Sequence, residues 1–200
     1  MSSENLYHVK RSCIDLKDPK ELHWKVAIPT TYTNLHAAKE SSKQALVKEG
    51  YSQSDFVKYE VNNGQKGWAY GSHVIVVAEG PSGETFTVEI ETMPNTADLT
   101  GDADGKVVEK LYHVVQTNID YNWDRSGSKR ETNIEGSYTN LDEAKKRALT
   151  TLLDDDVRKE DFLDYKEYVQ CGTSPFGPDN LVHAIKNNGE NNLVSIISSP

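Results

Sequence analysis

Cysteine is scarce in this 200-residue sequence, which contains only Cys13 and Cys171, and their positions match no zinc or redox spacing. We therefore expect two free thiols in a reducing compartment, which predicts a cytoplasmic protein; a single disulfide is the alternative. No run approaches the roughly 18 apolar residues that a membrane-spanning helix requires. The N-terminus reaches charged residues before any apolar segment, so we expect no secretory signal and no membrane association.

Basic residues are outnumbered, because 31 acidic side chains face 22 basic ones and give a formal charge of −9. Nucleic-acid affinity depends mainly on neutralising phosphates, and the chain contains no basic stripe that would do so. We expect no nucleic-acid partner. A protein partner or a small-molecule ligand is the prediction, with the chain acting as a monomer or a homodimer.

The signatures of common catalytic and cofactor sites are missing: no Gly-rich nucleotide loop, no H-E-x-x-H and no G-x-S-x-G occurs. The segment 98–106, DLTGDADGK, resembles a calcium loop. Aligning Asp102, Asp104 and Gly105 to that pattern places Leu111 where the bidentate glutamate should stand. We therefore predict neither a metal site nor a cofactor.

An internal repeat is the strongest feature that the sequence does contain. The string YTNL occurs at 32–35 and again 106 positions later, at 138–141, and LYHV occurs at 6–9 and at 111–114. Residues 32–94 align with 138–200 without a gap, and identical pairs recur throughout, such as Phe56 with Phe162. The chain is therefore one module written twice.

The repeat predicts the fold class and the domain boundaries. Module 1 should cover 1–94 and module 2 should cover 110–200, with a Gly- and Asp-rich linker at 95–109. In each module, alternating apolar residues predict about five strands, and the pattern after YTNL predicts one helix. We expect an α+β fold in which a mainly antiparallel sheet has the helix on one face, and the two copies pack together pseudo-symmetrically.

The repeated YTNL is best explained by architecture. Thr33 and Thr139 stand directly before the helical patterns, where a hydroxyl can accept a hydrogen bond from an unpaired helical amide. Asp142 would complete a capping box in module 2, whereas module 1 has His36 at that position. We predict a strand-to-helix junction capped by threonine.

Two sets of residues are candidates for a binding site. The first is the aromatic and titratable pair in each LYHV: Tyr7 with His8, and Tyr112 with His113. Histidines related by a pseudo-twofold axis could share a ligand or a proton, but inert, hydrogen-bonded strand histidines are the commoner outcome. The second set lies in the Gly-rich loops at 62–72 and 168–178, where Trp68, Tyr70 and Phe176 are either exposed anchors or caps on a small core.

Three functional hypotheses remain open at this stage. The leading one is a non-catalytic binding protein, because the residues that the modules share look structural. The second is a cofactor-independent isomerase, cyclase or hydrolase with a pocket between the modules, using the LYHV residues as acid–base groups. The third is a carbohydrate-binding protein that uses Trp68 and Tyr70.

Overall fold

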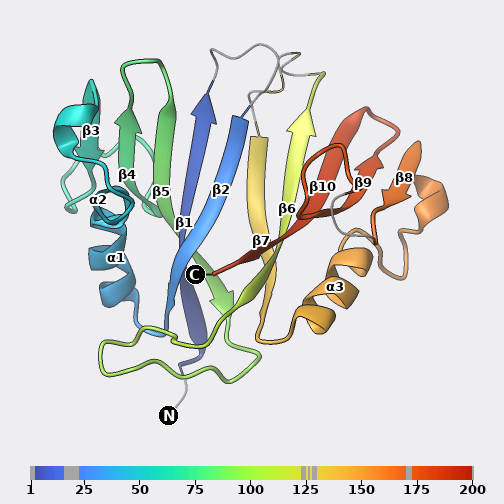
Figure 1. Cartoon of the computed structure of the whole chain (residues 1–200), viewed down its shortest axis with the longest axis horizontal. Helices are drawn as coiled ribbons and strands as arrows, with labels where there is room; N and C mark the ends of the chain where they lie inside the picture. The colour runs from blue at the N-terminus through green and yellow to red at the C-terminus, as the bar shows by residue number, and fades with distance from the viewer. Residues whose placement is uncertain are drawn as a thin grey trace. The chain divides into compact units, whose positions relative to one another are not determined.

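The chain divides into two compact units, Met1–Glu109 and Lys110–Ser199, in a computed structural model. The structure describes residues 3–15, 23–122, 125, 127, 130–169 and 173–199, with the backbone alone at 23 and 24. Figure 1 draws unit 1 from blue to green and unit 2 from yellow to red. No helix in the described ranges is long and apolar enough to span a membrane. The packing of the two copies against each other stays a prediction.

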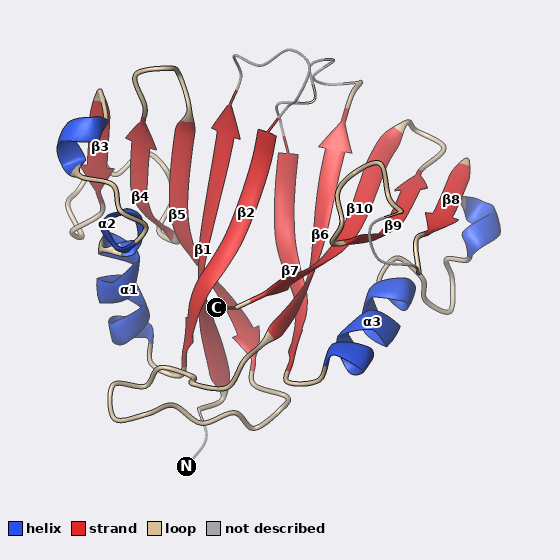
Figure 2. Cartoon of the chain, in the orientation of Figure 1, coloured by secondary structure: helices blue, strands red, loops and turns tan. Residues whose placement is uncertain are grey.

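Unit 1 contains a five-stranded antiparallel sheet with the strand order β2-β1-β5-β4-β3 (Figure 2). The chain enters at the second strand position, adds the neighbouring edge strand, crosses to the other edge through helices and returns strand by strand to the centre. Its elements are β1 (Asn5–Asp15), β2 (His23–Tyr32), α1 (Leu35–Lys43), α2 (Ala45–Lys48), η1 (Gln53–Asp55), β3 (Lys58–Val61), β4 (Val74–Glu79) and β5 (Thr85–Pro94).

Unit 2 repeats this topology with the order β7-β6-β10-β9-β8. The register is repeated too, because Tyr7 on β1 pairs with Tyr32, and Tyr112 on β6 pairs with Tyr138. Its elements are β6 (Tyr112–Asp120), β7 (Arg130–Tyr138), α3 (Leu141–Thr150), η2 (Lys159–Asp161), β8 (Asp164–Glu167), β9 (Asn180–Ile185) and β10 (Glu190–Ser198). The predicted α+β duplication with five antiparallel strands per copy is confirmed.

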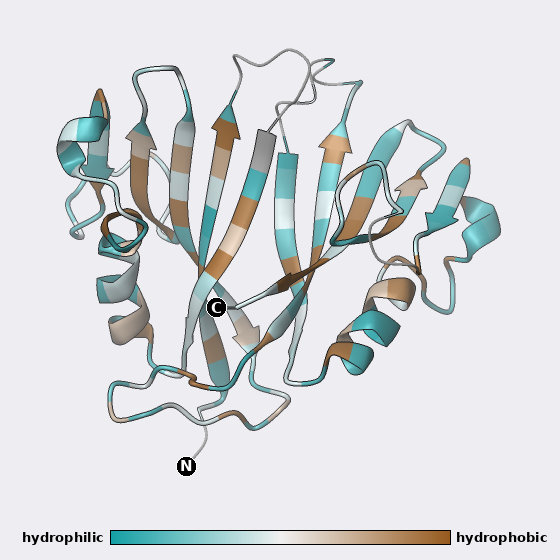
Figure 3. Ribbon diagram, viewed as in Figure 1, coloured by the Kyte–Doolittle hydropathy of each residue, from teal (hydrophilic) through white to brown (hydrophobic). Residues whose placement is uncertain are grey.

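Each sheet forms a hydrophobic core with its own helix. In unit 1, Val9, Val76 and Val88 are fully buried on the face that Ala38 and Leu46 contact from α1 and α2. In unit 2, Val114, Val182 and Val194 meet Ala144 and Ala148 of α3. Apolar bands recur along the strands of both sheets in Figure 3. Because successive strand residues point to opposite faces, every second position carries the core.

The residues between these core positions point to the other face of each sheet. On β1 they include Leu6, His8 and Lys10, all of which are buried. On β6 they include His113 and Val115, which are also buried. The histidines of LYHV therefore lie on the face opposite the helix.

The helices begin one residue later than the sequence predicted. Asn34 caps α1 by accepting a hydrogen bond from the Ala37 amide at 3.0 Å, and Asn140 caps α3 by accepting from the amides of Asp142 and Glu143. The predicted threonine caps are wrong. Asparagine is a better cap residue than threonine, and Thr33 instead donates its hydroxyl proton to the Gly105 carbonyl at 3.1 Å.

The predicted linker at 95–109 lies against unit 1. The Asn95 amide donates to the Glu4 carbonyl at 2.9 Å, and the Val107 amide donates to the Thr31 carbonyl at 2.9 Å. Leu99 and Val107 are buried, although the segment is rich in glycine and aspartate. This segment continues the fold of unit 1 beyond β5, as far as the boundary at Glu109.

Candidate functional site

The repeated histidines hold equivalent positions inside their sheets. The Nδ1 atom of His8 lies 2.9 Å from Thr31 Oγ1 on β2, and that of His113 lies 2.8 Å from Ser137 Oγ on β7. Both side chains are fully buried. Burial lowers the pKa of His8 to about 4, because it disfavours the charged ring. His8 is therefore neutral near pH 7, and each ring links two neighbouring strands.

The tyrosines of LYHV lie apart from these histidines. Tyr7 packs against the helix-side core of unit 1 and Tyr112 packs against that of unit 2. Because neighbouring strand residues point to opposite faces, the structure does not bring Tyr7 to His8 or Tyr112 to His113. Within each unit, the sequence-predicted acid–base pair is divided by the sheet itself.

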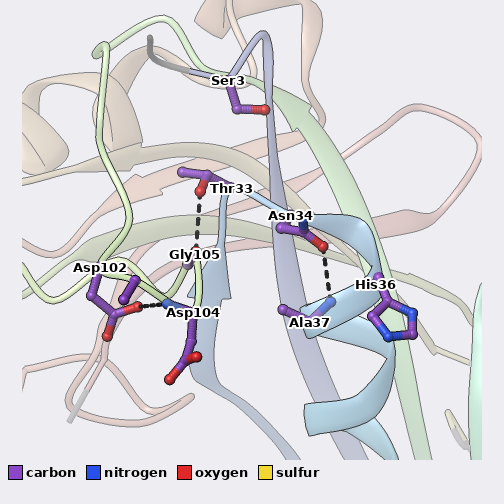
Figure 4. A pocket seen from close by; sticks show the side chains of 9 residues that line it. Ser3, Thr33, Asn34, His36, Ala37, Asp102, Asp104 and Gly105 are labelled. Atoms are coloured by element: carbon purple, nitrogen blue, oxygen red, sulfur yellow. Dashed lines mark hydrogen bonds between the residues drawn. The ribbon is translucent and has the colours of Figure 1, made fainter.

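A polar hollow of about 430 Å³ opens where α1 meets the 102–105 turn (Figure 4). Two of the side chains that line it, Asn34 and Asp102, already accept hydrogen bonds from backbone amides of the chain. Asn34 caps α1, and Asp102 Oδ1 accepts from the amides of Asp104 at 3.0 Å and Lys106 at 2.9 Å. The calcium-like segment is thus used as a hydrogen-bonded turn. No group of three metal-ligating side chains occurs in the parts of the chain that the structure describes.

The 62–72 loop gathers the predicted aromatic residues of unit 1 over the edge strand β3. The rings of Trp68 and Tyr70 meet edge to face with their centroids 5.0 Å apart. The Trp68 indole donates to the Gly71 carbonyl at 3.0 Å, which fixes the orientation of the ring. Gly71 has φ +90°, and a Cβ there would press against the His73 ring, so the turn that accepts the indole requires glycine.

Two charged residues of β3 complete this cluster. Lys58 Nζ donates to the Tyr70 hydroxyl at 2.7 Å, and that hydroxyl donates to Glu60 Oε2 at 2.7 Å. The hydrogen bond to Tyr70 raises the pKa of Lys58, and the one from Tyr70 lowers the pKa of Glu60. Both charges are therefore kept near pH 7 while their side chains remain 36% and 45% exposed. We call Lys58, Glu60, Trp68 and Tyr70 the aromatic–ionic surface.

The equivalent place in unit 2 has lost this arrangement. Phe176 stands where Tyr70 does, is 48% exposed and packs on the His183 ring at 4.4 Å. The charges of the edge strand are reversed, with Asp164 paired to Lys166 at 2.9 Å. Ser174 replaces Trp68 and bonds Asn180. Residues 170–172 of the predicted loop lie outside the described residues. The relay through a tyrosine hydroxyl is thus specific to unit 1.

Sequence reasoning missed the charged members of this surface. Lys58 and Glu60 are ordinary polar residues in a strand pattern, and only the fold of the 62–72 loop brings Tyr70 back onto them. The reversal of charge between Lys58/Glu60 and Asp164/Lys166 was visible in the repeat alignment, and it marks a place where the copies differ in chemistry.

Another ionic group lies on the face of the unit 1 sheet opposite the helix. Lys10 Nζ lies 2.9 Å from Glu89 and 2.6 Å from Glu91, and its side chain is only 6% exposed. Burial lowers the pKa of Lys10, but attraction to the two carboxylates and their hydrogen bonds outweigh it, so the pKa is raised. The aligned residues of unit 2 are Val115, Ser195 and Ile197, so this group too is specific to unit 1.

Comparison with known proteins gave no match to a family model, to a curated protein or to a solved structure.

Proposed function

We propose that the protein is a non-catalytic binding protein of the cell interior, and that it engages its partner through the aromatic–ionic surface of unit 1. The observation that carries this proposal is the relay from Lys58 through Tyr70 to Glu60 beside a partly exposed tryptophan. The free thiol at Cys13 supports a reducing compartment.

A comparison of the residues that both copies share with those that differ supports the same proposal. Residues that both copies keep have structural roles, such as the capping asparagines and the strand-linking histidines. The residues of the aromatic–ionic surface differ between the copies in charge and in ring type. A duplicated scaffold that keeps its framework and changes one exposed loop is what specialisation for binding would produce.

The surface is also organised before any partner arrives. Trp68 is held by Gly71, and Tyr70 is held at its hydroxyl by two charged groups. Tryptophan and tyrosine lose little conformational entropy on binding and are the residues most enriched at binding hot spots. Lys58 and Glu60 add a donor and an acceptor for polar groups of a partner.

A photo-crosslinking experiment tests the proposal. A benzophenone amino acid is placed at position 69, which is exposed between Trp68 and Tyr70, and at the aligned exposed position 175 of unit 2 as the control. After irradiation in extract from the natural source, we expect one discrete adduct from position 69 and no such adduct from position 175. Mass spectrometry of the adduct distinguishes a polypeptide from a small ligand.

The test is decided by whether formation of the adduct requires Trp68. Trp68→Ala should remove the adduct without unfolding the chain, because Trp68 lies in a surface loop. An adduct that persists in this variant, or one that forms equally at position 175, would refute the assignment of the surface.

The aromatic–ionic surface combines the partly exposed Trp68 ring with the donor Lys58 and the acceptor Glu60. This combination also favours a carbohydrate as a second candidate, because sugars offer both an apolar face and hydroxyl groups. A glycan array with the native chain and the Trp68→Ala variant separates this candidate from a protein partner. Signals that disappear in the variant would favour the carbohydrate, and uniform background would dismiss it.

A further inference from the structure

A second concavity in unit 1 lies at the end of the sheet near the β4–β5 hairpin, away from the loop that carries the aromatic–ionic surface. Its volume is about 400 Å³, within the usual range for small-molecule sites. Three rings form its apolar wall: Tyr51, Phe56 and Phe86, with centroids 5.3 to 5.5 Å apart. Tyr51 is 37% exposed, so part of this wall is open to solvent.

The charges around this cavity are unbalanced. Three carboxylates and two cations line it, namely Asp15, Asp55, Glu84, Arg11 and Lys25. Arg11 already pairs with Glu49 at 3.1 Å, so its charge is largely compensated. Asp15 has an interaction of its own; without it, the described lining still sets Asp55 and Glu84 against Lys25, so these residues carry an excess of negative charge.

Comparison with unit 2 shows which cation pairs with the carboxylate aligned with Glu84. Glu84 and Glu190 are aligned residues, and in unit 2 Glu190 pairs with Lys186 at 2.8 Å. The residue aligned with Lys186 is Gly80, which has no side chain to offer. Among the described residues, the only hydrogen-bond donor to the Glu84 carboxylate is the Ser82 amide at 3.2 Å. Unit 1 thus has the same acid, but glycine stands where unit 2 has the lysine that neutralises it.

The apolar wall of the cavity also differs between the two units, because unit 2 lacks two of its three rings. The residues aligned with Tyr51 and Phe86 are Val157 and Asn192. The Asn192 side chain accepts from Gln116 at 3.1 Å, so hydrogen-bonded amides occupy the place of an aromatic ring. Where unit 2 has Lys186 paired with Glu190 and hydrogen-bonded amides, unit 1 has a glycine, two further rings and a cavity.

From this comparison we propose that the cavity binds a small organic cation, a primary amine that carries an aromatic ring. The ring packs on Tyr51 and Phe86, and the ammonium group takes the position beside Glu84 that the Lys186 ammonium holds beside Glu190. The ring wall and the carboxylate together select the ligand, since an aromatic face and an anion both favour a cation. This site is independent of the aromatic–ionic surface, and each can fail alone.

The test uses 2-phenylethylammonium as the probe and phenylacetate as a matched anion. Cys13 lines the cavity, and the Cys171→Ser variant leaves it as the single thiol, so its alkylation rate reports occupancy. Burial raises the pKa of the Cys13 thiol, which keeps the uninhibited reaction slow enough to follow. We expect the cation to protect Cys13 with a dissociation constant on the order of 1 mM or tighter, a reasonable affinity for a ligand of this size. Phenylacetate should give no protection.

Three substitutions decide whether the site is the one proposed, each made in the Cys171→Ser background. Gly80→Lys supplies the lysine of unit 2 and should abolish protection, and Glu84→Gln should weaken binding about tenfold, as expected for the loss of a charge-assisted hydrogen bond. Glu190→Gln, the aligned change in unit 2, should leave binding unchanged. Because Gly80 has an ordinary φ and its new Cβ would meet only the flexible end of Glu84, Gly80→Lys should fold.

Titration calorimetry repeats the measurement without the thiol. Equal protection by phenylacetate would overturn the preference for a cation. Absence of protection by either probe at 10-fold above the expected dissociation constant, about 10 mM, would overturn the site itself. Binding that survives both Gly80→Lys and Glu84→Gln would place the amine elsewhere and overturn the comparison with Lys186.

Discussion

Replacement of Lys10 tests how the buried ionic group contributes to stability. Lys10→Met keeps most of the apolar stem but removes the ammonium group that contacts both Glu89 and Glu91. Breaking a buried ion pair costs about 3–5 kcal/mol. The two glutamates retain 20% exposure each and stay partly hydrated, so we expect the lower end, about 2–4 kcal/mol of unfolding free energy.

The repeat supplies the reference for this measurement. The triple variant Lys10→Val, Glu89→Ser and Glu91→Ile copies the residues of unit 2, and an ion-pair group exchanged for packed apolar residues is often neutral or stabilising. We expect its unfolding free energy within about 1 kcal/mol of the native value or above it, hence well above that of Lys10→Met. Non-additivity of this kind is what distinguishes a coupled group from three independent residues.

Urea denaturation followed by far-ultraviolet circular dichroism at pH 7 measures both variants. Lys186→Met is the matched control, because Lys186 is 44% exposed in its pair with Glu190 and should contribute less than about 1 kcal/mol. A Lys10→Met variant that loses less than the Lys186→Met control would refute the reasoning. So would a triple variant that is less stable than Lys10→Met.

Three other predictions concern equivalent positions of the two units and one titrating group. The buried Tyr59 hydroxyl has no hydrogen-bond partner among the described residues, whereas the Tyr165 hydroxyl donates to the Leu149 carbonyl at 3.3 Å. Thermal denaturation should therefore show Tyr59→Phe neutral or stabilising by about 1 kcal/mol and Tyr165→Phe destabilising by about 0.5–1 kcal/mol; the reverse order would contradict the hydrogen-bond assignment. Asn34→Ala and Asn140→Ala should each lower stability by about 1 kcal/mol, and Thr33→Ser, which keeps the hydroxyl, should change it far less; urea titrations that show no loss for either asparagine would contradict the reassigned caps. Because His8 has a pKa of about 4 in the folded chain against 6.5 as its ordinary value, its neutral form stabilises the fold above pH 6.5, and up to about 3 kcal/mol is lost as the pH falls to 4. His8→Gln should flatten the stability profile between these pH values, and a profile as steep as the native one would show that another group titrates.

Repetition and periodicity predicted the elements of each copy and a mainly antiparallel sheet, but not the order of its strands. The two copies of YTNL marked the helix entries, and the apolar run of β4 and the alternation of β5 marked strands, because these signals depend only on local geometry and on which faces are buried. The position of the cap could not be read in the same way. Threonine and asparagine are adjacent in both copies and both can cap, but asparagine is the stronger cap residue, and both helices use it, at Asn34 and Asn140.

Some residues of the candidate site could likewise be identified from the sequence, and others could not. Trp68 and Tyr70 could be identified from sequence because loops on rigid scaffolds often carry binding residues, but their partners Lys58 and Glu60 could not. In LYHV, repetition at the same strand position in both copies suggested a shared site, yet the alternation of a strand puts Tyr7 and His8 on opposite faces.

The sequence by itself determined the duplication, the class of fold and the strands and helices of each copy, since these follow from short-range pattern and from the identity of aligned residues. Only the tertiary structure decided which polar groups meet: Lys10 with two glutamates of β5, and Tyr70 with two residues of β3. Lys10 and its partners lie on strands far apart in the chain, and Tyr70 reaches Lys58 and Glu60 only because the 62–72 loop folds back, so no local pattern encodes these contacts.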